Sequence, residues 1–242
     1  MRRWFFLLLV ASIAVVLYFE VLIIRHIEFT GNNRFNEAEL FTLSGIVYED
    51  SLLRLDTDAV QASLQQNPYI AVEKIEKRYP STVAISISER KAVAVTDFGG
   101  TSVLLDAEGI VLSLSAEDVQ ENMTSIGGWT VEDAVLGEKI QTTQELQLST
   151  FSQAMREIVK QRFLPEVKSL DLSALSQIQM ELHNGMQVKM GTTDRIERKV
   201  AWMSQMVPEL IAEGYSGGLL DVSAGTTASY SPGKTPENGV EE

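Results

Sequence analysis

The stretch from residue 70 to residue 88 reads IAVEKIEKRYPSTVAISIS and predicts two β-strands joined at Pro80-Ser81. Its second half alternates strictly between apolar and small side chains, which is the pattern of a strand with one buried face; the apolar positions are Val83, Ile85 and Ile87. The first half changes parity in its middle, and a β-bulge near Glu73-Lys74 would return its apolar residues to one face. The stretch therefore predicts a β-hairpin with one apolar face.

One alternating strand and two short helices precede this hairpin. Asn36 and Glu39 have the spacing of a capping box at the start of a helix, and Gly45 is suited to end that helix. A second helix is expected from Asp56-Thr57, since either residue can cap its N-terminus. The predicted order is β-α-α-β-β, in a domain that covers residues 25–91.

Two hairpins are predicted in the residues that follow, which form a second domain over residues 92–232. In the first, a turn over residues 106–109 would pair Leu105 with Ile110 and Val103 with Leu112. In the second, a three-residue loop, His183-Asn184-Gly185, keeps apolar residues opposite one another and requires a left-handed Gly185. That register pairs Leu182 with Met186, Met180 with Val188 and Ile178 with Met190.

Two amphipathic helices complete the second domain. Thr142 and Glu145 have capping-box spacing, and apolar residues follow at helical intervals: Leu148, Phe151, Met155, Ile158 and Val159. The second helix is expected from Thr193-Asp194 onward. Short strands are expected at 219–222 and 226–231, and residues 233–242 have the composition of a disordered tail. The fold class is therefore α+β, with a mixed α/β domain built on an antiparallel sheet and two helices.

The N-terminal residues predict a membrane anchor. An apolar run from Trp4 to Ile24, interrupted only by Glu20, would be about 31 Å long as a helix at ~1.5 Å per residue, which matches the hydrocarbon core of a bilayer. Arg2-Arg3 before the run puts the N-terminus in the cytoplasm and the remaining domains outside. The alternative is a cleaved signal peptide, but the run is longer than the usual apolar core of one and no A-x-A-like site follows closely.

Composition limits the chemistry that the chain can perform. The net charge is −13, which argues against nucleic-acid binding, and the acidic character of the exterior part argues against its electrostatic adhesion to anionic lipid. There is no Cys, so disulfides, thiolate chemistry and most structural zinc sites are excluded. The only histidines are His26 and His183, and no nucleotide-binding or hydrolase motif occurs. We therefore expect no enzymatic activity, no cofactor and no metal, although a carboxylate-dependent cell-wall hydrolase stays open as an alternative.

The order of several short motifs after the anchor resembles the FtsQ/DivIB family of bacterial cell division proteins. The first domain is similar to that family's POTRA (polypeptide-transport-associated) domain through IEFTGNNRF at residues 27–35, NPYI at 67–70, YPSTV at 79–83 and ERKAVA at 89–94. The second matches through LDAEGIV at residues 105–111 and LDVS at 220–223. Ala92 stands where members of the family often have Pro, which is a minor departure.

The resemblance implies a non-enzymatic scaffold in the plasma membrane at the division septum. Its members bind two small bitopic proteins, FtsL and FtsB/DivIC, and the complex helps to control the septal peptidoglycan synthase. The partner's segment adds to the edge at the end of the second domain, which here is Thr226, Thr227, Ala228, Ser229, Tyr230 and Ser231. An unpaired edge strand is also a physical template for strand addition.

Tyr230 is the large aromatic residue of this predicted edge and its expected anchor for a partner. The alternative is that its ring packs on its own domain. A cell-wall-binding module is a further alternative function for the whole chain.

Overall fold

The computed structural model describes residues 22–120 and 123–233, together with Trp4. The chain divides into two compact units between Arg90 and Lys91, and each unit has its own apolar core. The predicted N-terminal anchor, apart from its last residues, and the predicted C-terminal tail beyond residue 233 lie outside the described residues. Among the helices that are described, none combines the length and apolar character needed to cross a bilayer.

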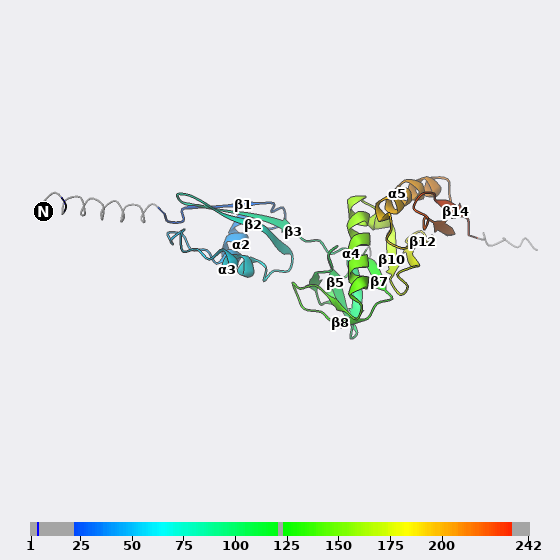
Figure 1. Ribbon diagram of the computed structural model, residues 1–242, viewed down its shortest axis with the longest axis horizontal. Helices are drawn as coiled ribbons and strands as arrows, with labels where there is room; N and C mark the ends of the chain where they lie inside the picture. Colours follow the sequence, from blue (N-terminus) through cyan, green and yellow to red (C-terminus); the bar gives the residue numbers. More distant parts are fainter. Residues whose placement is uncertain (1–3, 5–21, 121–122, 234–242) are drawn as a thin grey trace, which may run out of the picture. The chain divides into compact units, whose positions relative to one another are not determined.

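The first unit is a three-stranded sheet with two helices on one face (Figure 1), in the β-α-α-β-β order that the sequence predicts. The sheet order is β1-β3-β2, with β1 parallel to the central β3 and β2 antiparallel to it. Its elements are β1 (His26–Thr30), α2 (Glu37–Ser44), α3 (Thr57–Leu64), β2 (Ile70–Arg78) and β3 (Thr82–Glu89). The alternating residues of β3 are buried beneath the helices, and the predicted bulge in β2 lies between Val72 and Lys74.

Local side-chain bonds explain where the helices of this unit begin and end. The Asn36 side chain accepts the N–H of Glu39 at 2.8 Å, and the Glu39 carboxylate accepts the N–H of Asn36 at 3.2 Å, so the predicted capping box is confirmed. Gly45 ends α2 in the left-handed region at φ 66°. The Asp56 carboxylate caps α3 by accepting two backbone N–H groups.

The structure corrects the boundary between the predicted anchor and the first unit. Leu22 and Ile24 are buried in the first unit, where the Leu22 carbonyl accepts the N–H of Leu52 and the Ile24 N–H donates to Asp50, both at 2.9 Å. The prediction that the membrane span continues to Ile24 is therefore wrong, because an apolar residue suits a protein core as well as a bilayer. The predicted span, if kept, is thereby limited to residues 4–21, which would measure about 27 Å as a helix at ~1.5 Å per residue.

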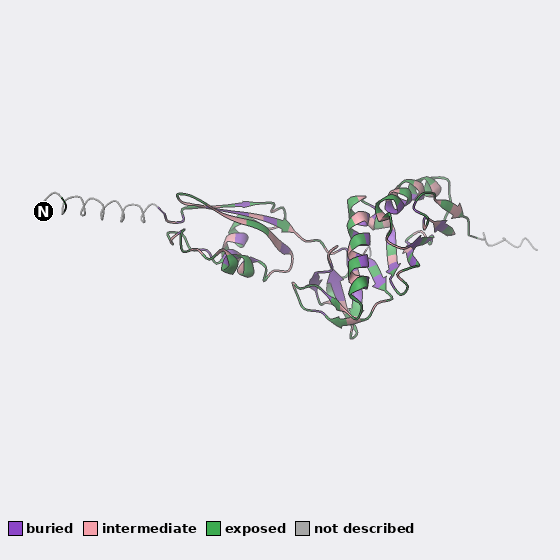
Figure 2. Cartoon of the chain, viewed as in Figure 1, coloured by how far each residue is buried: buried purple, intermediate pink, exposed green. Residues whose placement is uncertain are grey.

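The second unit is built on one nine-stranded sheet in the order β14-β13-β12-β11-β10-β7-β4-β5-β6, with a separate β8-β9 pair. Its strands are β4 (Ala94–Phe98), β5 (Thr101–Leu105), β6 (Val111–Ser113), β7 (Thr124–Gly127), β8 (Val131–Asp133), β9 (Gln141–Thr142), β10 (Val167–Asp171), β11 (Ile178–Leu182), β12 (Gln187–Gly191), β13 (Leu219–Asp221) and β14 (Ser229–Ser231). Its helices are α4 (Glu145–Lys160) and α5 (Ile196–Ala212), with short 3₁₀ turns at Ala116–Asp118 and Leu164–Glu166. Figure 2 shows buried positions along the strands, and these share one core with the inner faces of α4 and α5.

The sheet of this unit is mixed, whereas the sequence analysis expected an antiparallel one. β10 is parallel to β7, β13 is parallel to β12, and β7 is parallel to β4. Parallel neighbours need a long crossover connection, commonly a helix. α4 lies between β7 and β10 in the chain, and α5 lies between β12 and β13. The two amphipathic helices are thus part of the connections that make the sheet mixed.

Both predicted hairpins form, but the register differs from the prediction in the first and at one end of the second. Leu105 pairs with Val111 and not with Ile110, because the Asp106 carboxylate accepts the N–H groups of Glu108 and Ile110 and draws Ile110 into the loop. In the second hairpin, the left-handed Gly185 (φ 82°) and the Met180–Val188 pair are confirmed. A register shift after Ile178 places that residue opposite Gly191 and not opposite Met190.

The ends of the two long helices also differ from the predictions. Gln144 precedes α4 without a capping side-chain bond, and Thr142 is the last residue of β9, so the predicted Thr142–Glu145 capping box is wrong. Val159 is exposed on the outer side of α4, while Phe151, Met155 and Ile158 are buried as expected. α5 begins at Ile196 and continues through Pro208.

Candidate functional site

The predicted partner-binding segment contains a shorter strand than expected. β14 comprises only Ser229–Ser231, antiparallel to β13 with Leu220 opposite Tyr230, and no described residue pairs with its outer edge. Thr226, Thr227 and Ala228 lie in the loop before it, so the predicted strand over 226–231 is wrong in its first half. The loop follows a turn in which the Gly225 N–H donates to the Val222 carbonyl at 3.0 Å.

The opposite edge of the same sheet is covered. The Val111 N–H of β6 donates to Glu138, and the Val111 carbonyl accepts the N–H of Gly137, both at 2.9 Å. Ile110 forms an isolated bridge with Lys139, and all three residues of β6 are buried. The segment around residue 138 therefore occupies the position that a further strand would need.

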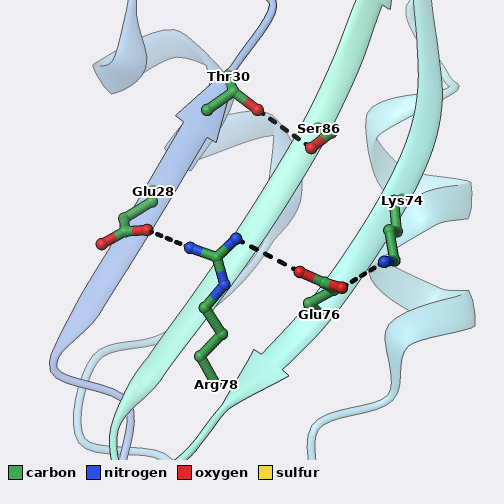
Figure 3. A network of polar contacts seen from close by, with 6 residues as sticks. All are labelled: Glu28, Thr30, Lys74, Glu76, Arg78 and Ser86. Carbon is green, nitrogen blue, oxygen red and sulfur yellow. Dashed lines mark hydrogen bonds and ion pairs between the residues drawn. The ribbon is translucent and has the colours of Figure 1, made fainter.

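The outer strands of the first unit carry charged side chains on the exposed face of their sheet. Arg78 of β2 contacts Glu28 of β1 at 2.9 Å and Glu76 of its own strand at 3.3 Å, and Lys74 pairs with Glu76 (Figure 3). Charged residues on an edge strand disfavour pairing with another chain. β14 reads Ser-Tyr-Ser and carries no charge, so it is the edge best suited to strand addition.

Backbone direction shows which residue of β14 faces the free edge. The Gly218 carbonyl accepts the N–H of Gln187, and the Val222 N–H donates to Lys189, so β13 turns Leu220 toward β12. Because successive residues of a strand direct their N–H and C=O groups to opposite sides, Leu219 and Asp221 face β14. Their partners Ser231 and Ser229 face back toward β13, which leaves the N–H and C=O of Tyr230 directed outward.

Pro232 follows this strand and has no N–H to offer. An incoming strand can therefore extend its pairing only toward the loop of Thr226, Thr227 and Ala228. These three loop residues belong to the predicted segment, and pairing with an incoming strand would bring them into strand conformation.

The Tyr230 ring packs on its own domain, as the alternative interpretation expected. Its hydroxyl donates to the Gly217 carbonyl at 2.9 Å, and its ring meets that of Tyr215 edge to face at 5.4 Å. Tyr230 is half-buried, while Tyr215 and Leu219 beside it are 41% and 43% exposed. The role of Tyr230 as an anchor stays a prediction, and the apolar surface at this edge includes two residues that the sequence analysis did not single out.

Two features of β13 and the residue before it bear on the surroundings of β14. Gly218 (φ 86°) lies so close to the strand that a Cβ atom there would stand 2.6 Å from the Ser231 carbonyl oxygen. The Asp221 carboxylate accepts the N–H of Ser223 at 2.9 Å and pairs with Lys189 at 3.5 Å. The pKa of Asp221 is lowered, chiefly by the hydrogen bond that the Ser223 hydroxyl donates and further by Lys189.

A groove of about 390 Å³ lies beside the loop that leads to β14, a feature the sequence analysis missed. Its lining residues are Arg198, Ala201, Trp202, Gln205, Gly225 and Thr226. Trp202 is partly exposed although it lies on α5, a helix that packs on the core. A tryptophan on the polar side of an amphipathic helix is the signal in the sequence that could have revealed this groove.

The two histidines of the chain lie in different units. His26 is exposed at the start of β1, and His183 is exposed on the β11–β12 loop. Residues 22–120 and 123–233 contain no group of three or more His, Asp or Glu side chains arranged to hold a metal ion. What the geometry offers is a strand edge, at β14, whose backbone groups meet no described residue.

Comparison with known families agrees with this architecture. Residues 22–90 match the family described as POTRA domain, FtsQ-type, and residues 92–223, more than half of the chain, match the C-terminal domain of cell division protein FtsQ/DivIB. The chain belongs to the FtsQ/DivIB family of cell division proteins. The FtsQ/DivIB match ends at residue 223, so β14 and the loop before it lie beyond the matched range.

Individual relatives bear the same names. The chain is 37% identical to a cell division protein FtsQ of Anaeromyxobacter sp. (strain K) over 92 residues, which is 38% of this chain and 31% of that protein. It is 24% identical to the FtsQ of Bartonella bacilliformis over 187 residues, 77% of this chain and 56% of that protein. It is 23% identical to the cell division protein DivIB of Clostridium acetobutylicum over 210 residues, 86% and 82% of the two chains. The chain thus spans about a third to a little over half of the first two FtsQ relatives.

Proposed function

We propose that this FtsQ/DivIB-family chain is a bitopic division scaffold that recruits other membrane proteins without catalysing a reaction. Residues 4–21 anchor it in the plasma membrane with the N-terminus in the cytoplasm, and both described units lie outside the cytoplasm at the septum. Its partners are small bitopic division proteins of the FtsL and FtsB/DivIC types. Through them the chain helps to control septal peptidoglycan synthesis.

The observation that carries this proposal is the uncharged outer edge of β14, whose Tyr230 backbone groups face outward and meet no described residue. A partner strand paired along residues 226–231 would form a few main-chain hydrogen bonds, each contributing about 0.5–1.5 kcal/mol. A micromolar complex needs about 8 kcal/mol. The remainder must come from side chains, and the exposed Tyr215 and Leu219 beside the edge can provide apolar contacts.

The test is a proline at Ala228, which has the same parity as Tyr230 and directs its N–H to the free edge once the loop is extended. In the full chain, embedded in lipid nanodiscs, Ala228→Pro should weaken binding of the FtsB/DivIC-type partner at least tenfold, because it removes a donor and blocks close approach. Ala228→Ser is the matched control, since it keeps the N–H and should bind like the unchanged chain.

A proline at Ser229 is a poorer test, because the Ser229 backbone faces β13 and the substitution would detach β14 from its own sheet. Unchanged affinity of the Ala228→Pro variant, with an unchanged melting temperature, would contradict the strand-addition mechanism. Binding that also survives deletion of residues 226–242 would move the partner site to another part of the chain and keep the scaffold role.

A further inference from the structure

Three segments that are distant in the sequence meet at one end of the first unit. The chain enters the unit along residues 22–24, which form a short antiparallel ladder with residues 50–52. The β2–β3 turn joins the same end, because its Ser81 carbonyl accepts the N–H groups of Arg25 and His26 at 2.9 and 3.2 Å. The Lys77 ammonium donates to the Leu53 carbonyl at 3.1 Å and links this turn to the α2–α3 loop. Figure 1 shows the turn and the loop beside the start of the described chain.

This end of the unit exposes apolar side chains from two of those segments. Leu53 of the α2–α3 loop is 40% exposed, and Tyr79 of the β2–β3 turn is 59% exposed. Single exposed apolar residues are common on protein surfaces and need no explanation. Here two of them lie on different loops at the same end, and that end is where the chain arrives from its proposed anchor.

The distance to the proposed span is short because no linker intervenes. The Leu52 N–H donates to the Leu22 carbonyl at 2.9 Å, so Leu53 lies at the end of the ladder closest to residue 21. One residue spans at most about 3.6 Å. The headgroup layer on each side of the hydrocarbon core is roughly 5–7 Å thick. If residues 4–21 cross the bilayer, Leu53 is within reach of the headgroup layer.

The charges at this end suit a lipid surface although the chain as a whole is acidic. Arg25 and Arg54 are exposed, and neither forms an ion pair with any described residue. The acidic residues of the same loop, Glu49 and Asp50, lie beside Ile24, one step farther from the span. Tyr is enriched at both membrane–water interfaces, and the long side chain of Arg can reach lipid headgroups from the boundary of the bilayer.

We propose that this membrane-proximal end of the FtsQ-type POTRA unit, comprising residues 22–26, 51–54 and 77–81, rests in the outer leaflet with Leu53 and Tyr79 inserted among the lipid headgroups. Arg25 and Arg54 face lipid phosphates. The inference rests on the proposed anchor. The contact would fix the orientation of the unit relative to the membrane. A domain attached only through a single helix would have no such fixed orientation.

The chain has no cysteine, so single-cysteine variants of the full-length protein can report depth directly. Leu53→Cys and Tyr79→Cys, each carrying an environment-sensitive fluorophore, are placed in nanodiscs whose lipids bear a nitroxide near the top of an acyl chain. Ala38→Cys, exposed near the N-terminus of α2, is the matched control within the same unit. Ser12→Cys, inside the proposed span, reports on the anchor independently.

The expected result is strong quenching at Ser12→Cys, at least twofold quenching at Leu53→Cys and Tyr79→Cys, and little at Ala38→Cys. If Ser12→Cys is quenched but Leu53→Cys and Tyr79→Cys are quenched no more than Ala38→Cys, the inference is overturned and the anchor is kept. Absence of quenching at Ser12→Cys would overturn the anchor and the inference with it. Leu53 and Tyr79 are exposed, so these variants should fold, and their circular dichroism spectra verify it.

Discussion

The β2 edge of the first unit and the β14 edge of the second are both outer strands, but they are held and protected in opposite ways. β2 is nine residues long, pairs over its whole length with a central strand and carries Lys74, Glu76 and Arg78. β14 has three uncharged residues, pairs with one short neighbour, lies close to Gly218 and bonds the Gly217 carbonyl through the Tyr230 hydroxyl. Charges of this kind disfavour pairing of a long edge with another chain. A three-residue edge exposes few unpaired backbone groups, so it needs less of this protection against aggregation.

The largest expected effect on stability comes from replacing, in each unit, a glycine that lies close to a strand of the sheet by alanine. A Cβ atom at Gly31 (φ 88°) would lie 1.9 Å from the Ile87 carbonyl oxygen, in the central strand of a three-stranded sheet that cannot move aside. Gly31→Ala should lower the free energy of unfolding of the first unit by about 3 kcal/mol or more. Gly218→Ala presses on β14, which can detach, so it should cost about 1–2 kcal/mol and weaken partner binding at least tenfold.

Denaturant titration separates the two units, because Trp129 and Trp202 lie in the second unit and no tryptophan lies in residues 22–90. Tryptophan emission should therefore follow Gly218→Ala and circular dichroism Gly31→Ala. The control is Gly99→Ala, a left-handed position (φ 61°) where a Cβ atom meets nothing within 4 Å. It should cost only about 1 kcal/mol of backbone strain. Equal losses for Gly31→Ala and Gly99→Ala would contradict the close approach at Ile87.

An intermediate effect is expected from acid, which protonates Glu89 in the first unit and Asp221 in the second, beside the exposed Glu76, whose pKa the neighbouring Lys74 also lowers. Burial alone would raise the pKa of Glu89, but the N–H groups of Arg34, Phe35 and Asn33 outweigh it and lower the pKa. The pKa of Asp221 is also lowered, chiefly by Ser223. A lowered pKa means that the stabilisation is complete above the ordinary carboxylate range and is lost as the pH falls through the lowered value.

On acidification, the first unit should therefore lose stability through Glu89. Asp221 holds Ser223, in the turn that leads to the loop before β14, so partner affinity at that edge should fall as Asp221 is protonated. Glu89→Gln should lower the stability of the first unit at neutral pH and make that stability less dependent on acid. Asp221→Asn should do the same to partner affinity. Melting temperature as a function of pH measures the first effect, and partner affinity as a function of pH measures the second. An acid dependence of partner binding that persists in Asp221→Asn would assign the effect to another group.

Features set by neighbouring residues could be predicted from the sequence. The capping box of α2 depends on Asn36 and Glu39, and the alternation of β3 is visible in five consecutive residues. Both survive in the fold because the forces that produce them act within one turn or one strand. The left-handed Gly185 was predicted for the same reason, since only that loop length matches the apolar residues on either side.

Features set by long-range contacts could not be read from the sequence. Leu22 and Ile24 look like the end of a membrane span until the α2–α3 loop is seen to pair with them. Thr226, Thr227 and Ala228 have the composition of a strand, but β13 is too short to pair with them. The outward direction of the Tyr230 backbone depends on how β13 pairs with β12, which no local pattern encodes.

The smallest expected effect concerns the charges of β2. Arg78, Glu28 and Glu76 are exposed ion-pair partners, and such pairs typically contribute about 0–1 kcal/mol. Replacing the neighbouring pair, as Lys74→Thr with Glu76→Thr, should change the free energy of unfolding of the first unit by less than about 1 kcal/mol. If the charges instead serve to keep the edge unpaired, the double variant should self-associate more strongly, which sedimentation velocity would detect as a rising weight-average coefficient with concentration. A monomeric double variant would show that the charges of Lys74 and Glu76 are not what keeps the β2 edge unpaired.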